Sequence, residues 1–137
     1  MIAALFLATL LFLGAIAAHL AILGGCCAAV ARNHTPIAKL TTSLIVLFSH
    51  LLVAACFAGG FWLGHRMGLG SFDKVPVMGW MDYFYFSLVN ITTLGLGDIY
   101  PTQHLRVIAG IESLTGFVLI SCSAQFFWIM LKQRNTH

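Results

Sequence analysis

The chain has 137 residues, of which 60% are hydrophobic and only 8% are charged, and its formal net charge is +3. Soluble domains carry about 25% charged residues, so this composition excludes a protein whose whole surface faces water. The few basic residues are scattered, which argues against a nucleic-acid-binding surface. The mean hydropathy of +0.95 indicates an integral membrane protein.

The first apolar stretch, residues 1–31, predicts a transmembrane helix. It contains no charged residue and exceeds the roughly 20 residues that a spanning helix needs. Its lack of arginine and lysine excludes a voltage-sensing helix. Residues 32–39 follow as a short basic loop that contains Pro36. The second apolar stretch, residues 40–64, predicts the next span, and the tryptophan near its end suits a membrane interface.

A short helix is expected after the second span, beyond a polar loop over residues 65–79. Residues 80–92, WMDYFYFSLVNIT, have a helical pattern but number only 13. At about 1.5 Å per residue, such a helix is too short to cross a bilayer. This length favours a re-entrant half-helix, with Asp82 in its first turn complementing the helix dipole. Residues 105–131 then predict the third full span, and residues 132–137 form a short cytoplasmic tail.

The charged residues predict an orientation for the three spans. Cytoplasmic loops of membrane proteins carry an excess of lysine and arginine. We therefore expect the N-terminus outside, the half-helix entering from outside, and the C-terminus in the cytoplasm. The basic residues on the cytoplasmic face are Arg32, Lys39, Lys132 and Arg134, whereas Arg66, Lys74 and Arg106 lie outside and are offset by Asp73, Asp82 and Asp98.

Between the half-helix and the third span lies the segment TTLGLGD, residues 92–98. Non-helical backbone is tolerated at membrane depth only where protein buries it or water lines it. Carbonyl groups that all point one way require residues of alternating left- and right-handed conformation, and glycine at every second position favours this alternation. Such a ladder of carbonyl oxygens can replace the water shell of a dehydrated cation. The expected ladder comprises Thr93, Leu94, Gly95, Leu96 and Gly97, with the Thr93 hydroxyl at its inner end.

The sequence YFSLVNITTLGLGDIYP, residues 85–101, resembles the pore helix and selectivity filter of tetrameric potassium channels. That family carries the signature T-V-G-Y-G-D, which this chain matches as T-L-G-L-G-D. The resemblance extends from about residue 80 to residue 131, and more loosely to the outer helix over residues 40–64. It implies a homotetramer around one axis, because each chain supplies a single filter strand. It also implies bound K⁺ ions in the filter and no other cofactor.

The resemblance assigns roles to single residues. Asp98 is implied to guard the outer mouth, and Gly116 stands where such channels often place a hinge in the inner helix. Leu96 departs from the family pattern, which has an aromatic residue there whose hydroxyl ties the filter to the surrounding helices. A weakly selective Na⁺/K⁺ channel therefore stays open as an alternative. The implied K⁺ ligands are the carbonyl groups of Thr93, Leu94, Gly95, Leu96 and Gly97, and the side chain of Thr93.

Glu112 is the only acid inside an expected span, and an ionisable group there is by default a functional hypothesis. If Phe117, Ile120 and Ala124 line the central cavity, a rotation of about 100° per residue turns Glu112 toward the back of the half-helix. We expect its carboxyl group to hydrogen-bond the rear of the filter. The alternative is a pair with Arg106 or with a loop amide at the outer boundary. The candidate partners behind the filter are Asn90, Tyr85 and Thr92.

Two histidines lie inside the first and second spans. His19 and His50 both fall within ~5 Å of the membrane midplane when positions are counted at about 1.5 Å per residue. One interpretation is a haem-binding, non-conducting membrane protein that uses both imidazoles. The other is interhelical hydrogen bonding that holds the first helix to the pore domain.

These patterns together predict an all-α membrane protein: three transmembrane helices, a re-entrant pore helix over residues 80–92 and an extended filter over residues 93–98. Residues 40–131 form the pore domain, with the inner helix over residues 105–131, and the first helix is an addition to it. No catalytic constellation is visible, so we expect a passive cation channel, selective for potassium, rather than an enzyme. The expected partners are lipid and permeant monovalent cations, in a plasma membrane that we expect to be the bacterial inner membrane.

Overall fold

The computed structural model of the chain describes residues 1–32 and 35–132. Three of its helices are long and apolar enough to cross a membrane, over Ile2–Ala28, Pro36–Arg66 and Leu105–Met130. The predicted all-α membrane protein is thereby confirmed. The described elements in chain order are α1 (Ile2–Arg32), α2 (Pro36–Arg66), β1 (Phe72–Asp73), α3 (Trp80–Ile91), β2 (Tyr100–Pro101) and α4 (Leu105–Lys132).

The helix α2 begins at Pro36 rather than at Leu40, so the predicted loop over residues 32–39 is too long. Thr35 is extended, and its hydroxyl oxygen accepts a hydrogen bond from the Ala38 amide at 3.2 Å. Proline is favoured in a first turn because its missing N–H has no helical partner there. After a threonine cap, Pro36 therefore starts a helix instead of marking a loop. Residues 33–34 of that loop and 133–137 of the predicted tail lie outside the described residues.

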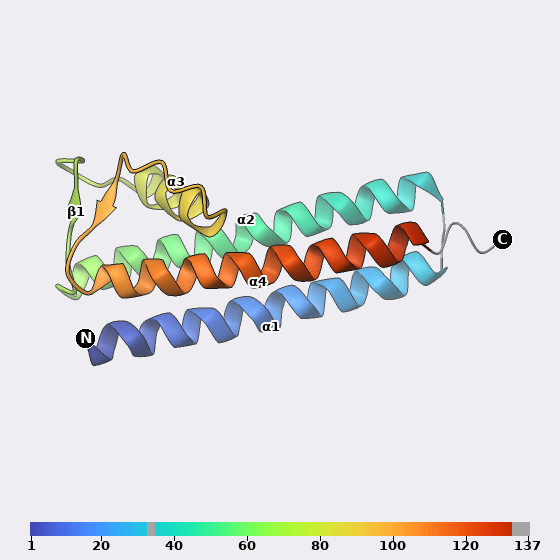
Figure 1. Cartoon of the computed structure of the whole chain (residues 1–137), viewed down its shortest axis with the longest axis horizontal. Coiled ribbons are helices and arrows are strands. Elements are labelled where there is room, and N and C mark those ends of the chain that lie inside the picture. The colour runs from blue at the N-terminus through green and yellow to red at the C-terminus, as the bar shows by residue number, and fades with distance from the viewer. Residues whose placement is uncertain (33–34, 133–137) are drawn as a thin grey trace.

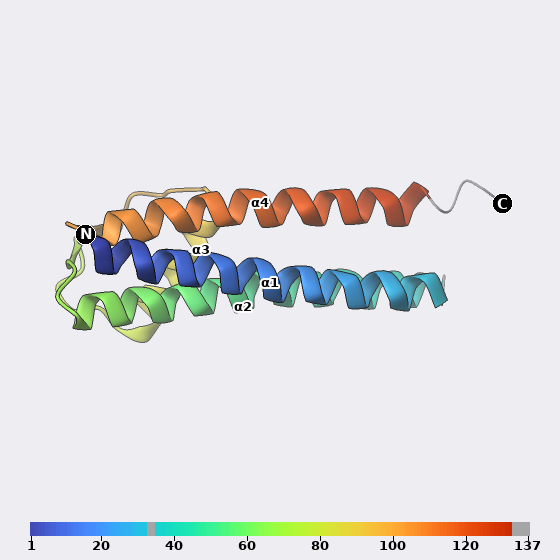
Figure 2. The same ribbon diagram turned by 90° about the horizontal axis from the view of Figure 1, so that it is seen from below.

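The three long helices run along one common axis, with α3 and the strands gathered where α2 ends and α4 begins (Figures 1 and 2). Helix α1 packs on both α2 and α4, and α3 packs on the same two helices. In Figure 1, α3 lies on the side of α2 and α4 that faces away from α1. The short helix and the first helix therefore occupy separate faces of the α2–α4 pair. The first turn of α1 lies at the α3 end of the bundle (Figure 1).

The loop between α2 and α3 is more ordered than a polar loop over residues 65–79 predicts. Within it β1 pairs with β2 in an antiparallel register that sets Phe72 opposite Pro101. The ring of Phe72 packs edge to face on Phe86 at 5.2 Å and on Tyr83 at 5.5 Å between ring centroids. Such edge-to-face geometry is favourable for aromatic pairs. The two strands and this aromatic cluster fix the segment after α3 against the helix itself.

Candidate functional site

Helix α3 has defined ends that set where the next segment starts. At its N-terminus, Asp82 Oδ2 accepts a hydrogen bond from the Gly79 amide at 2.8 Å, which caps the helix and complements its dipole. At its C-terminus, the Thr93 and Leu94 amides donate to the carbonyl groups of the last helical turn at 3.0 and 3.1 Å. The chain therefore leaves α3 in a tight turn immediately before the glycines.

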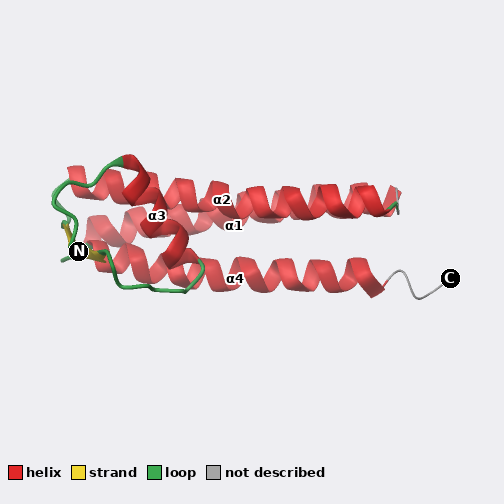
Figure 3. Ribbon diagram, turned by 90° about the horizontal axis from the view of Figure 1, so that it is seen from above, coloured by secondary structure: helices red, strands yellow, loops and turns green. Residues whose placement is uncertain are grey.

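The backbone after α3 alternates in handedness. The φ angles are positive at Thr93 (58°), Gly95 (56°) and Gly97 (74°), and the leucines between them stay on the ordinary side. This is the alternation that the glycine spacing predicts, and Thr93 shares it without being a glycine. Figure 3 shows the segment as a loop that returns from α3 toward the strands at the same end of the molecule. Leu94 and Leu96 are 64% and 57% exposed, so the segment presents an open edge within one protomer.

The outer end of this segment is held by Tyr85 and Asp98. The Tyr85 hydroxyl donates to Asp98 Oδ2 at 2.7 Å. That hydrogen bond is the main cause that holds the pKa of Asp98 below its ordinary value, with the charge of Lys74 adding to it. Leu96 cannot supply the hydroxyl that ties the filter to its surroundings in potassium channels. In this chain Tyr85 instead ties α3 to Asp98, two residues beyond Leu96.

Glu112 lies at the rear of α3, fully buried, in a cluster that joins three helices. Its Oε2 accepts a hydrogen bond from the Asn90 side-chain amide at 2.6 Å, and its Oε1 is bonded to the Ser87 hydroxyl. The Ser87 hydroxyl also lies 2.6 Å from the Ala54 carbonyl oxygen of α2. The Asn90 side-chain amide donates a second hydrogen bond to the Ala109 carbonyl oxygen of α4 at 2.8 Å. We call this set (Ala54, Ser87, Asn90, Ala109 and Glu112) the Glu112 cluster.

The cluster matches one of the three predicted partners of Glu112. Asn90 bonds it, but the Tyr85 hydroxyl goes to Asp98, and the Thr92 hydroxyl goes to carbonyl groups of its own helix at 3.0 Å. The alternative pair with Arg106 is also wrong, because that guanidinium donates to the Pro101 carbonyl at 3.2 Å. Ser87 was missed. Its position three residues before Asn90, on the same face of the helix, is the signal that would have found it.

Gly116 marks the closest approach between α4 and the end of α3. A Cβ atom at this position would lie 1.7 Å from the Ile91 carbonyl oxygen. Only a residue without a side chain allows this contact. The implied hinge at Gly116 stays a prediction, because α4 is one continuous helix here. The observed reason for glycine is the approach of two backbones at the inner end of the filter segment.

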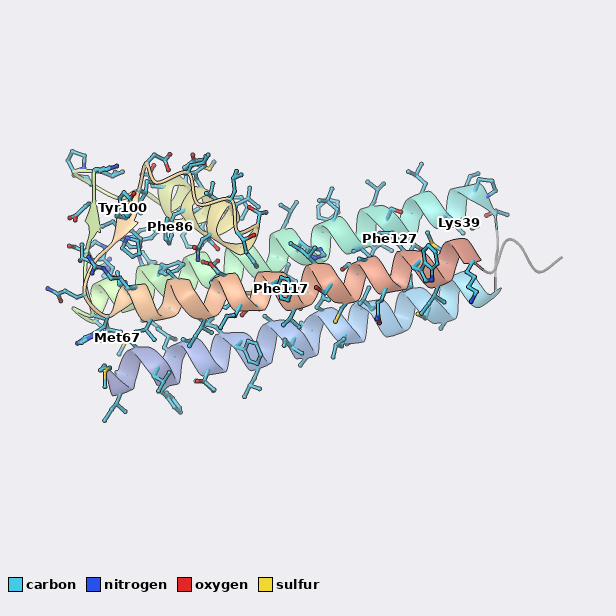
Figure 4. All side chains as sticks on the ribbon, in the orientation of Figure 1. Lys39, Met67, Phe86, Tyr100, Phe117 and Phe127 are labelled. Carbon is cyan, nitrogen blue, oxygen red and sulfur yellow. The ribbon has the colours of Figure 1, made fainter. Side chains whose placement is uncertain are left out.

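The predicted cavity residues lie on an unpacked face of α4. Phe117 and Ile120 are 67% and 45% exposed, and Ala124 is exposed as well. Figure 4 labels Phe117 near the middle of α4, beyond the part that carries α3. Ile120 and Ala124 also border a groove of about 350 Å³ between α2 and α4, next to His50. An apolar face that finds no partner within one protomer is what a cavity lining or a subunit contact requires.

His19 and His50 meet edge to face, and Ser123 contacts both rings. Their ring centroids lie 4.8 Å apart. The two nitrogens of His19 contact the Ser49 and Ser123 hydroxyls at 2.7 and 3.0 Å, and His50 Nδ1 donates to the Val46 carbonyl at 2.8 Å. Ser123 also lies 3.5 Å from His50 Nε2. We call His19, Ser49, His50 and Ser123 the histidine cluster.

Serine hydroxyls on two other helices engage both ring nitrogens of His19, which supports interhelical hydrogen bonding at this imidazole. The cluster joins α1 to α2 and α4, as the second interpretation of the histidines expects. The missed members were Ser49 and Ser123, which sequence reasoning cannot pair with a residue on another helix.

Comparison with known proteins assigns the chain to a class. A family model described as "Ion channel" matches residues 51–133, which is more than half of the chain. The match covers the second half of α2, helix α3, the segment that follows it, and α4. The chain therefore belongs to the ion-channel family, in its potassium-channel pore type, and it is a multi-pass membrane protein.

A named relative points the same way over a shorter stretch. Potassium channel K2 of Plasmodium berghei (strain Anka) is 44% identical over 46 residues, which are 32% of this chain and 3% of that protein. The chain thus spans only a small part of the length of this relative. No solved structure matches the chain.

Proposed function

We propose that four copies of this chain assemble around one axis into a potassium-selective channel. Conduction is passive: ions step between rings of carbonyl oxygens of Thr93, Leu94, Gly95 and Leu96, with Gly97 at the outer end. Asp98 stands at the outer mouth, held by Tyr85. The observation that carries this proposal is the alternating backbone handedness at the tip of a half-helix, within a chain of the ion-channel family.

The filter in this proposal is supported from two sides. Tyr85 holds Asp98 at the outer end, and the Glu112 cluster holds the rear of α3 against α2 and α4. The face of α4 that carries Phe117, Ile120 and Ala124 lines the cavity below the filter. The excess of basic residues favours a cytoplasmic C-terminus and an outward-facing filter, in the plasma membrane of a bacterium.

A weakly selective Na⁺/K⁺ channel is the second candidate, and Leu96 is the observation that favours it. This side chain is 57% exposed and supplies no hydroxyl to tie the filter. A less constrained ladder adapts its carbonyl spacing to a smaller ion more readily, which reduces discrimination.

The test is the reversal potential of the purified protein in planar bilayers under opposed K⁺ and Na⁺ gradients. Potassium selectivity predicts a value near the K⁺ equilibrium potential, whereas a value midway between the two equilibrium potentials supports the weakly selective channel. A haem Soret band in protein without K⁺ flux would support the non-conducting alternative instead.

Gly95→Ala tests the filter assignment. An L-residue at φ 56° is strained, and its methyl group would project from the conducting segment, so current should be abolished. The matched control is Gly14→Ala in α1, where a Cβ meets nothing within 4 Å. Full current through the Gly95→Ala protein would contradict the assignment.

A further inference from the structure

Lys74, in the loop between α2 and α3, reaches the outer end of the filter segment. Its Nζ donates a hydrogen bond to the Gly97 carbonyl oxygen at 2.7 Å. The same ammonium group lies 4.6 Å from the centroid of the Tyr100 ring. Gly97 is the last residue of the alternating stretch, so its carbonyl group is the outermost one of the proposed ladder. The Lys74 ammonium group is therefore bound to the carbonyl oxygen that would coordinate an ion at the outermost position of the ladder.

The backbone pairing before this lysine brings it to the filter segment. The preceding residue, Asp73, pairs with Tyr100 in the β1–β2 ladder, which brings the loop to the segment that follows the filter. Lys74 itself has a φ of 72°, a left-handed conformation that is uncommon for a residue other than glycine. Such a conformation persists only where the surrounding structure determines it, and these positions gather at functional sites.

The surroundings of the ammonium group form a cation site. A carbonyl oxygen accepts a hydrogen bond from it, an aromatic face lies beside it, and the Asp98 carboxylate is close enough for the charge of Lys74 to act on it. An alkylammonium head carries the same charge as a potassium ion and has a similar size. The groups that bind the one therefore suit the other.

We infer that Lys74 is a tethered cation that competes with extracellular potassium for the outermost position of the filter. This inference rests on the proposed function and adds a regulation of the same site. At low external potassium the ammonium group stays on the Gly97 carbonyl and reduces the entry of ions. At high external potassium the ions displace it, and the lysine swings into solvent, because it is exposed and bound by a single hydrogen bond.

A purely mechanical role for Lys74 makes the opposite prediction. If the hydrogen bond only clips the filter, its removal loosens the ladder, so current or selectivity falls at every potassium concentration. Competition instead predicts a gain of inward current that disappears as external potassium rises. The dependence on potassium therefore separates the two roles.

The experiment measures single-channel inward current of Lys74→Gln against external potassium concentration. We expect about twofold to fivefold more current than wild type at low external potassium, and equal currents at high potassium. The control is Arg66→Gln, which removes one positive charge from the same face. The Arg66 guanidinium lies over the Trp62 ring at 5.3 Å and away from the filter carbonyl groups, so only a small change is expected.

Three results would overturn the inference: a Lys74→Gln current equal to that of Arg66→Gln at low external potassium, a gain that persists at high potassium, or a loss of current. A wild-type protein without any potassium current would overturn the proposed function together with it. A conducting wild type with an unaltered Lys74→Gln variant would contradict only the role of Lys74. Size-exclusion profiles of the variants confirm that their assembly is unchanged.

Discussion

The inner helix α4 carries two buried polar clusters, and they differ in what they join. Near its start, the Glu112 cluster ties the half-helix α3 to both α2 and α4. Further along, the histidine cluster ties α1 to the same two helices through Ser49 and Ser123. Among the described residues, every buried side-chain nitrogen and oxygen atom has a hydrogen-bond partner, including those of both clusters. Apolar surroundings require this, because water is not available as a partner.

The two clusters also differ in their relation to the family. Every member of the Glu112 cluster lies within residues 51–133, which match the ion-channel family. In the histidine cluster, only Ser123 lies in that range, and His19 belongs to the additional helix. The ion-channel match therefore contains the whole polar support of α3, whereas the polar attachment of α1 lies mostly outside it, although Ala4, Ala8 and Ala15 of α1 also pack into the common apolar core. Damage to the first cluster should reach the filter, and damage to the second should not.

The largest effect is expected from Gly116→Ala. The new Cβ would meet the Ile91 carbonyl oxygen at 1.7 Å, and a backbone group in a helix cannot yield that far. Helix α4 is pushed from α3, which should destabilise the protein by about 3 kcal/mol and remove selective current. Thermal unfolding in detergent and the reversal potential measure this.

Gly110→Ala is the control for Gly116→Ala, because a Cβ there meets nothing within 4 Å. If the two variants have the same stability and reversal potential, the close contact at Gly116 is refuted.

Glu112→Ala comes next. It empties a fully buried site and removes an acceptor from both Ser87 and Asn90, at an expected cost of about 2 kcal/mol. Selectivity should fall as well, because the rear of the half-helix loses its support. The reversal potential and thermal midpoint report both effects.

Glu112→Gln is the control for the same site. An amide offers one acceptor for Asn90 and one donor for the Ser87 hydroxyl, which then donates to the Ala54 carbonyl. Near-wild-type stability and selectivity are expected. If both substitutions behave alike, hydrogen bonding at this site does not support the filter.

His19→Leu should have a smaller effect confined to the attachment of α1. The apolar side chain keeps the contact surface, and the Ser49 and Ser123 hydroxyls can turn to carbonyl groups of their own helices. We expect a loss of about 1 kcal/mol in thermal stability and an unchanged reversal potential. Leu20→Ala, half exposed on the same helix, is the matched control. A changed reversal potential in His19→Leu would break the distinction between the two clusters.

The smallest effect is expected from Tyr85→Phe, at the exposed outer end of the filter. Loss of the hydroxyl removes the main cause that lowers the pKa of Asp98, so that pKa moves up toward its ordinary value of 3.8. A carboxyl group whose pKa is lowered in the folded protein stabilises the fold at pH values above its unfolded pKa. That stabilisation is lost as the pH falls through the folded pKa. The variant should therefore lose current at a higher external pH than wild type during acid titration. Identical titrations would show that this hydrogen bond does not hold the outer mouth.

Local patterns in the sequence predicted much of this molecule. Hydropathy marked the three spans, because a spanning helix must be apolar over a known length. The brevity of residues 80–92 marked the half-helix, and glycine spacing predicted the left-handed backbone at Gly95 and Gly97. Helical periodicity also turned Glu112 toward the rear of α3, because side-chain direction along a helix is a local property.

Only the tertiary structure decided which groups meet. Ser87 and Glu112 lie 25 residues apart, and His19 and Ser123 lie 104 apart, so no local spacing pairs them. The role of Gly116 depends on where a second backbone passes, and the reach of Lys74 to Gly97 depends on the pairing of two short strands. Spans, half-helix and backbone handedness follow from the sequence itself, whereas contacts between distant segments depend on how the helices pack.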